Sequence, residues 1–166
     1  MQIIIVGCGK VGKTIVEQLC MENHDITVID NNPEVIQEVT TQIDVMGVVG
    51  NGASFSVQKE AGIEESDLLI AVTQSDEINL LCCLFAKKAG ISSTIARVRN
   101  PLYREEIPYI KEELGLSMTI NPEKQAAVEI QRLLKYPGFL RRDTFAKGRT
   151  EIVELRVEKG SKLCNV

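Results

Sequence analysis

A short segment near the start of the chain, VGCGKVGKT, carries two overlapping phosphate-binding patterns. Gly7, Gly9 and Gly12 fit G-x-G-x-x-G, whose glycines allow a tight turn, close approach of backbone amides to a pyrophosphate, and close packing of a helix on a strand. Lys13 and Thr14 complete a second pattern, G-x-x-x-x-G-K-[ST], in which a lysine and backbone amides hold the phosphates of a nucleoside triphosphate. Both patterns need a strand before the loop and a helix after it, so residues further along must decide between them.

Asp30 favours the dinucleotide pattern. It lies 18 residues after Gly12, at the end of an apolar run, where this pattern expects an acidic residue. A carboxylate there accepts hydrogen bonds from both ribose hydroxyls of an adenosine and repels a 2′-phosphate, which favours NAD(H) over NADP(H). The triphosphate pattern has no evident arginine finger or placed glutamine to support catalysis. We therefore predict a dinucleotide-binding loop, with Lys13 and Thr14 as exposed residues of the first helical turn and an NTPase as the alternative.

The elements that must position these residues alternate regularly between strand and helix. Continuous apolar runs predict strands buried on both faces, and apolar residues at helical spacing predict the helices between them. The predicted strands are residues 3–6, 26–29, 45–49, 68–72, 94–98 and 118–120. Asn32-Pro33 and either Ser75 or Asp76 are predicted helix starts, and Gly62 and Gly90 predicted stops. This alternation predicts an α/β fold with a doubly wound, parallel, six-stranded sheet of order 3-2-1-4-5-6, the Rossmann fold.

The rhythm changes after Asn121-Pro122. Apolar residues between 126 and 134 predict one more amphipathic helix, and Tyr136-Pro137-Gly138 ends it. Residues 153–158 then alternate apolar and charged, which predicts a half-exposed strand without a partner in this chain. We predict a nucleotide-binding domain at 1–135 that includes the last helix, a linker at 136–150, and the start of a truncated C-terminal subdomain at 151–166.

The composition is that of a soluble globular protein. The chain has 166 residues, of which 44% are hydrophobic and 25% charged, with a net charge of −4. An acidic chain argues against general binding of nucleic acids, which needs a basic surface. No apolar run is long enough to span a membrane. Residues 3–6 are too short for a signal peptide, so we predict a cytoplasmic protein. The five cysteines form no C-x-x-C pair and are predicted to be inert thiols, and the single histidine, His24, cannot build a metal site.

Catalytic residues are not evident. Hydride transfer needs a substrate site and usually a proton donor, and dehydrogenases generally supply both from a further domain. The predicted sheet occupies the first 120 residues and leaves little chain for that purpose. His24 falls between the first helix and the second strand, at the wrong edge of the sheet. We predict a nucleotide-binding module that is not an enzyme, with a fragment of an NAD-dependent oxidoreductase as the alternative.

Several segments together resemble the TrkA family of potassium-uptake regulators, whose nucleotide-binding unit is the RCK or KTN domain. The matching segments are residues 4–12, 25–30, 50–54, 71–79, 95–99, 121–123 and 136–138. The A-V-T-x-x-D-E-x-N and A-R-x-R segments are far more specific than the glycine pattern. The resemblance covers roughly residues 1–140, and the tail looks like the start of the family's C-terminal ligand-binding subdomain.

The resemblance implies a regulatory role. Members of the TrkA family are cytoplasmic subunits of potassium channels or transporters. They lie at the inner face of the cell membrane as peripheral proteins. They sense NAD(H), or ATP and ADP, and pass the bound state to the membrane pore. They form homodimers that assemble into tetramers or rings. The helix after Asn121-Pro122 would be the crossover helix that helps to build the dimer.

The resemblance also implies a set of binding residues. These are Gly7, Cys8, Gly9, Lys10, Val11, Gly12, Asp30, Asn31, Asn51, Thr73, Gln74 and Arg97. By position, Asp30 holds the adenosine ribose, while Asn51 and Thr73 line the adenine and ribose side. Arg97 reaches toward phosphate, where its forked guanidinium suits an anion.

Four of these residues have structural alternatives. Asp30 is instead a solvent-facing charge. Thr73 instead caps the helix that follows it, and Asn51 instead shapes a turn. Arg97 instead pairs with a carboxylate such as Asp76 or Glu77. Asn51 also stands where many relatives carry aspartate, a departure that bears on ligand preference.

Overall fold

The computed structural model describes residues 1–135, 139–145, 149–157 and 160–161. The chain divides into two compact units, Met1–Asn121 and Pro122–Val166, and each is described by itself. The last predicted helix, assigned above to the nucleotide-binding domain, falls into the second unit by this division. The predicted helix end at Tyr136-Pro137-Gly138 lies outside the described residues, as does Cys164.

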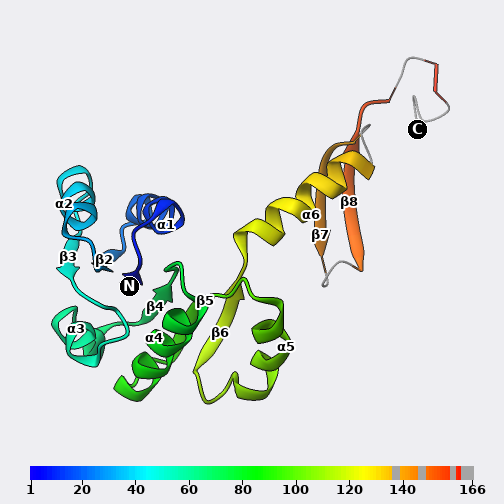
Figure 1. Cartoon of the computed structure of the whole chain (residues 1–166). Helices are drawn as coiled ribbons and strands as arrows, with labels where there is room; N and C mark the ends of the chain where they lie inside the picture. Colours follow the sequence, from blue (N-terminus) through cyan, green and yellow to red (C-terminus); the bar gives the residue numbers. More distant parts are fainter. Residues whose placement is uncertain (136–138, 146–148, 158–159, 162–166) are drawn as a thin grey trace. The chain divides into compact units, whose positions relative to one another are not determined.

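The first unit is built on one parallel sheet (Figure 1). Its strands are β1 (Gln2–Val6), β2 (Asp25–Asp30), β3 (Met46–Val49), β4 (Leu68–Ala71), β5 (Ser93–Arg97) and β6 (Leu116–Ile120). Their order is β3-β2-β1-β4-β5-β6, and every neighbouring pair is parallel. The predicted Rossmann fold and strand order are therefore confirmed.

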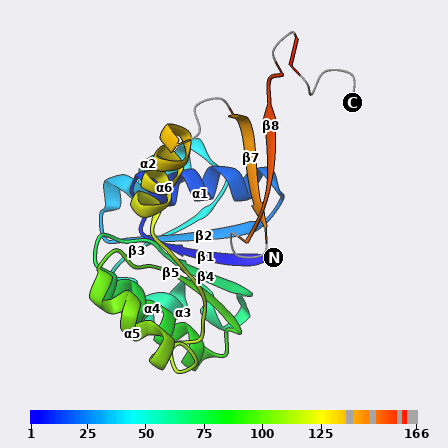
Figure 2. The ribbon, with the colours of Figure 1, turned by 90° about the vertical axis from the view of Figure 1, so that its right-hand side faces the viewer.

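Helices cover both faces of this sheet. They are α1 (Lys10–Met21), α2 (Pro33–Gln42), α3 (Phe55–Glu60), the short 3-10 helix η1 (Ile63–Glu65), α4 (Asp76–Ala89) and α5 (Pro101–Ile110). Figure 2 shows α1 and α2 on one face and α3, α4 and α5 on the other. Alternate residues of β1 enter two separate cores: Ile3 and Ile5 pack on the side of α1, and Ile4 and Val6 on the side of α4. Burial on both faces explains why the strands appear as continuous apolar runs.

The helix boundaries follow local sequence signals. The Asn32 side chain accepts a hydrogen bond from the N–H of Glu34 at 2.9 Å and caps α2, as the Asn-Pro pair predicts. Gly90 ends α4 in the left-handed conformation, with φ of 106°. The sequence analysis did not predict α5, although Asn100 and Pro101 repeat the same start signal. A second proline inside the helix, Pro108, hides the pattern.

The second unit contains α6 (Pro122–Lys135), β7 (Phe139–Phe145) and β8 (Thr150–Leu155). The two strands pair antiparallel, so the prediction that the strand near residues 153–158 has no partner in this chain is wrong. β7 lies inside the range predicted as linker. Its residues FLRRDTF carry three charges in the middle of the strand and lack the clean alternation that marks a strand.

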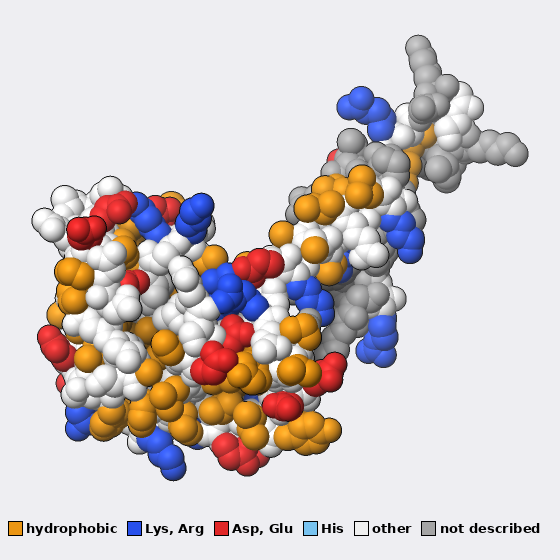
Figure 3. Space-filling view, in the orientation of Figure 1, with side chains coloured by type: hydrophobic (Ala, Val, Ile, Leu, Met, Phe, Trp, Pro, Cys, Tyr) orange, Lys and Arg blue, Asp and Glu red, His pale blue; other side chains and the backbone are white. Residues whose placement is uncertain are grey.

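The described helices are too short or too polar to span a membrane. Within residues 1–135, which contain all of them, none combines the length and apolar character that crossing a bilayer requires. On the face of the first unit seen in Figure 3, acidic and basic side chains are interspersed.

Candidate functional site

Two glycines of the loop after β1 are required by the fold itself. Gly7 has φ of +93°, and a Cβ there would lie 2.9 Å from the backbone of Thr73 at the end of β4. A Cβ on Gly12 would lie 1.9 Å from the carbonyl oxygen of Gly7. Gly7 therefore allows the turn, and Gly12 lets α1 approach the loop, as the dinucleotide pattern predicts.

Gly9 is different, because the fold does not require a glycine there. Its φ is −66° and its ψ is −169°, an extended conformation open to any residue. A Cβ on Gly9 would meet nothing within 4 Å. The missing side chain therefore leaves open space in front of α1 without serving the packing of the protein.

The N-terminus of α1 faces this space without a side-chain cap. Gly9 is its N-cap and offers no side-chain acceptor, and the first turn carries no acidic residue. The N–H of Lys13 bonds to the carbonyl of Gly9, so the N–H groups of the three residues before it have no acceptor within the helix. By contrast, side chains cap α2, α4 and α5. These N–H groups and the helix dipole make the start of α1 a site for an anion.

Asp30 connects the end of β2 to the glycine loop. One carboxylate oxygen, Oδ2, accepts a hydrogen bond from the N–H of Cys8 at 2.8 Å, and Oδ1 accepts one from the N–H of Asn32 at 2.9 Å. A carboxylate offers about four lone-pair positions, so about two remain for a ligand. Asp30 therefore shapes the loop and keeps acceptor capacity beside it. Asn31, the next predicted site residue, is exposed.

Lys13 and Thr14 do not face the loop as the triphosphate pattern requires. The ammonium of Lys13 bonds to Glu38 at 2.6 Å and to Gln42 at 2.8 Å, both on α2. The hydrogen bond that the ammonium donates to Glu38 raises the pKa of Lys13. The Thr14 hydroxyl donates to the carbonyl of Lys10 in its own helix at 3.0 Å. The lysine is also 29% exposed rather than fully exposed, because α2 holds it. This geometry favours the dinucleotide pattern.

Cys8 lies inside the loop but is not a nucleophile. Its side chain is buried, and burial together with the nearby Asp30 carboxylate raises the pKa of the thiol to about 12. Burial likewise raises the pKa of Cys82 to about 12 and that of Cys83 to about 11. Because a thiol must be deprotonated to react, these groups are inert near neutral pH, as predicted.

The ends of β4 and β5 carry a polar cluster that the sequence analysis did not assign to the site. Asn79 of α4 is fully buried and bonds to Thr73 and to the carbonyl of Arg97. Asp76, which the structural alternative offered with Glu77 as a partner of Arg97, pairs with Arg99, with Nε and Oδ1 3.8 Å apart. The motif A-V-T-x-x-D-E-x-N, quoted above for the resemblance, contains both residues and was the available signal.

Asn51 and the residues around it follow β3 at the same edge of the sheet. Its side chain accepts a hydrogen bond from the N–H of Ala53 at 3.0 Å, so it shapes the turn after β3, which was the structural alternative. The buried Gln58 holds the same turn, because its amide donates to the carbonyl of Gly52 at 2.7 Å and to that of Cys82 at 3.2 Å. Nothing in the local pattern distinguished Gln58 as more than a helix residue.

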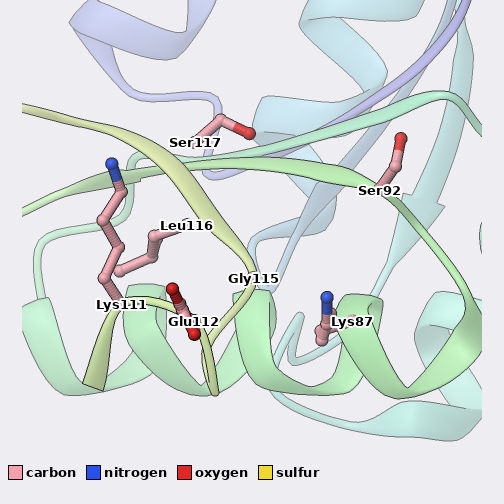
Figure 4. A pocket seen from close by; sticks show the side chains of 7 residues that line it. All are labelled: Lys87, Ser92, Lys111, Glu112, Gly115, Leu116 and Ser117. Carbon is pink, nitrogen blue, oxygen red and sulfur yellow. The ribbon is translucent and has the colours of Figure 1, made fainter. Parts of the chain in front are cut away.

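The fold brings the predicted residues to one edge of the sheet. All lie at or just after the carboxyl ends of β1 to β5, and the strand order reverses between β1 and β4. Ligands of open α/β sheets bind at such a point. Another pocket, of about 450 Å³, lies at the opposite edge, where β5 and β6 begin (Figure 4). Its lining includes Lys87 and Lys111 and none of the predicted site residues.

The strand order and the uncapped start of α1 after the glycine loop define a Rossmann-type domain. The model of the TrkA-N domain family matches residues 3–122, and the chain belongs to that family. A Trk system potassium uptake protein TrkA homolog from Archaeoglobus fulgidus is 40% identical over 163 residues, which cover 98% of this chain and 37% of that protein. The chain thus spans little more than a third of the length of the curated relatives it first matches.

Solved structures share the fold. The TrkA-N domain of the inner membrane protein ybaL from Escherichia coli superposes with a TM-score of 0.70 at 24% identity, over 80% of this chain and 96% of that chain. The GsuK channel, solved bound to NAD and also bound to ADP, gives a TM-score of 0.60 at 21% identity, over 72% of this chain and 21% of the NAD-bound one.

Proposed function

We propose that this chain is the nucleotide-sensing part of a cytoplasmic regulator of potassium uptake. The ligand lies across the carboxyl ends of β1, β2 and β4, with its phosphates at the start of α1. Membership of the TrkA-N family and the name of the Archaeoglobus relative support the link to potassium uptake. The proposal takes the chain to be a binding module rather than an enzyme.

One observation carries the binding site. Gly9 is a glycine that neither the backbone conformation nor the packing requires, and it lies at the uncapped N-terminus of α1. A pyrophosphate needs the same two features: open space and backbone N–H groups that have no other acceptor. The Asp30 carboxylate lies beside it and accepts from the loop amide of Cys8.

NAD(H) is the ligand that the geometry favours. Asp30 can accept ribose hydroxyls and would repel a 2′-phosphate, and the crevice extends from β2 to β5. ATP and ADP are the second choice, because the same amides and the same carboxylate serve any adenine nucleotide. The GsuK channel, which shares the fold, has been solved with NAD and with ADP.

The regulatory step follows from linkage. A ligand moves an assembly between two shapes only by as much as it binds one shape better than the other. The partner is a membrane potassium channel or transporter subunit, and the chain works as a homodimer within a tetramer or ring at the inner face of the membrane. Equal nucleotide affinity of the open and closed assemblies would contradict this coupling.

Calorimetric titration tests the binding proposal. NADH, NAD⁺, ATP and ADP are each titrated into the chain and into Asp30→Ala. Asp67→Ala is the matched control, because Asp67 also accepts a backbone N–H, that of Gln2, at the far edge of the sheet. We expect binding that Asp30→Ala weakens and Asp67→Ala does not. Binding of ATP alone that needs Mg²⁺ and Lys13 but not Asp30 would favour the NTPase, and steady oxidation of NADH would favour the oxidoreductase.

A further inference from the structure

Asn79 lies at a split in the sheet. Pairing between β4 and β5 extends to Ala71 and Ala96. Beyond that point Val72 donates its N–H to the last residue of β1 at 2.8 Å, and Arg97 pairs with β6. At this end of the sheet β4 therefore pairs only with β1, and β5 only with β6. The carboxyl ends of β4 and β5 separate from each other. The side chain of Asn79, which is fully buried, bridges this split.

The bridge uses the whole amide group. Its Oδ1 accepts from the N–H of Thr73 at 2.8 Å and from the Thr73 hydroxyl at 2.7 Å. Its Nδ2 donates to the carbonyl of Thr73 at 3.3 Å and to the carbonyl of Arg97 at 2.9 Å. An amide has two acceptor and two donor positions, and all four are used here. Asn79 therefore takes the place of the missing strand pairing and sets the distance between the two strand ends.

Asp76, three residues earlier on α4, holds the neighbouring loop in the same way. Its Oδ2 accepts from the N–H of Arg99 at 2.9 Å and from the N–H of Asn100 at 2.7 Å. Only 6% of Asp76 is exposed. The first turns of α4 thus fix both the end of β5 and the chain that follows it.

This bridge lies where the far half of a nucleotide would extend. Asp30 and the glycine loop take the adenosine and the phosphate attached to it, on the side of β2. A dinucleotide crosses the sheet where the strand order reverses, so its remainder lies over β4 and β5. Thr73 lies directly against the glycine loop, because a Cβ on Gly7 would be 2.9 Å from the Thr73 backbone.

We propose that Asn79 is a positioning residue for the far half of the ligand. By tying Thr73 to Arg97, it sets the affinity for whatever follows the first phosphate, and it leaves the affinity for the adenosine half unchanged. The proposal rests on the nucleotide-binding function above and adds to it the residue that distinguishes a long ligand from a short one.

The test compares long and short ligands in the same titration. NAD⁺ and ATP are the long probes and AMP is the short one. Asn79→Asp keeps the acceptor toward Thr73 but replaces the two donors with a charged oxygen beside the carbonyl of Arg97. We expect about tenfold weaker binding of the better long ligand, the size expected when the hydrogen bond to Arg97, the one that spans the split, is lost, and AMP affinity within about twofold.

Thr94→Val is the matched control. Thr94 is equally buried in β5, and its hydroxyl bonds to the carbonyl of Gly115 at 2.8 Å, away from the crevice. It should lower stability without changing the ratio of long to short affinity. Equal losses for AMP and the long ligands in Asn79→Asp, or the same change of ratio in Thr94→Val, would overturn the proposal.

A measurement on the unmodified chain covers the case in which Asn79→Asp does not fold. In ¹⁵N spectra, the side-chain amide of Asn79 should shift when NAD⁺ or ATP is added and stay in place when AMP is added. A shift with AMP of the same size would overturn the proposal even though nucleotide binding stood. If none of the three ligands bound, the proposed function itself would fail, and this inference with it.

Discussion

Substitution of Gly9 by alanine separates binding from folding. The new Cβ would meet no protein atom within 4 Å, and the backbone already has a conformation that alanine adopts. Alanine is a poorer N-cap than glycine, so the free energy of unfolding should fall by less than about 1 kcal/mol. The same methyl group points into the space where a phosphate must approach the amides of α1. If it displaces one charge-assisted hydrogen bond, binding weakens by about 1.5–3 kcal/mol, or about tenfold to hundredfold.

Gly12→Ala is the matched comparison, because it reverses the two effects. Its Cβ would lie 1.9 Å from the carbonyl oxygen of Gly7, and no flexible side chain can relieve that contact. Either α1 or the loop must move, at a cost of about 1–3 kcal/mol or more. In a protein of this size, each kcal/mol lowers Tm by about 2–4 °C.

Two assays read this pair of variants. Thermal unfolding followed by circular dichroism measures Tm, and calorimetric titration with NAD⁺ and ATP measures affinity. We expect Gly9→Ala to lose affinity while its Tm falls by less than about 2–4 °C, and Gly12→Ala to show the larger fall in Tm. Unchanged affinity in Gly9→Ala would refute the argument that the open space at Gly9 serves a ligand.

Three further predictions concern side chains around the crevice. Lys13→Ala should keep nucleotide affinity within about twofold, because Glu38 holds the ammonium away from the loop; a loss above tenfold in calorimetry would contradict this. Hydrogen bonds from Ser75 and Tyr103 lower the pKa of Glu77 from 4.5 to about 2, so the stability they supply is present above pH 4.5 and is lost as pH falls toward 2. Glu77→Gln should therefore make Tm depend less steeply on pH over that range. An unchanged slope of Tm against pH would contradict this prediction. Cys8, whose pKa is raised to about 12, should resist a thiol reagent at pH 8 in the native protein, and rapid labelling found there by mass spectrometry would contradict its burial.

The sheet could be predicted because its signals are local. Strands buried on both faces leave unbroken apolar runs, and a glycine loop followed by Asp30 at the end of the next run fixes the order of the first two strands. The cap signals at Asn32 and Ser75 placed two helices correctly, since capping depends on a few neighbouring residues.

The missed elements depend on context that a local pattern does not contain. Pro108 lies inside α5, where a local pattern predicts a helix end, and the charged centre of β7 gains its strand conformation from pairing with β8. Asn79 and Gln58 are polar residues on helices, and their sequence spacing gives no sign that they are buried. Their roles come from contacts with residues 18 and 24 positions away.

The proposed function requires a nucleotide to bind at the start of α1. An NMR titration of the ¹⁵N-labelled chain with NAD⁺, repeated with ATP, tests it most directly. We predict that the largest shifts occur at the backbone amides of Lys10, Val11 and Gly12, which have no acceptor within the helix. Shifts confined to the pocket that contains Lys87 and Lys111, or no shifts with either ligand, would contradict the claim.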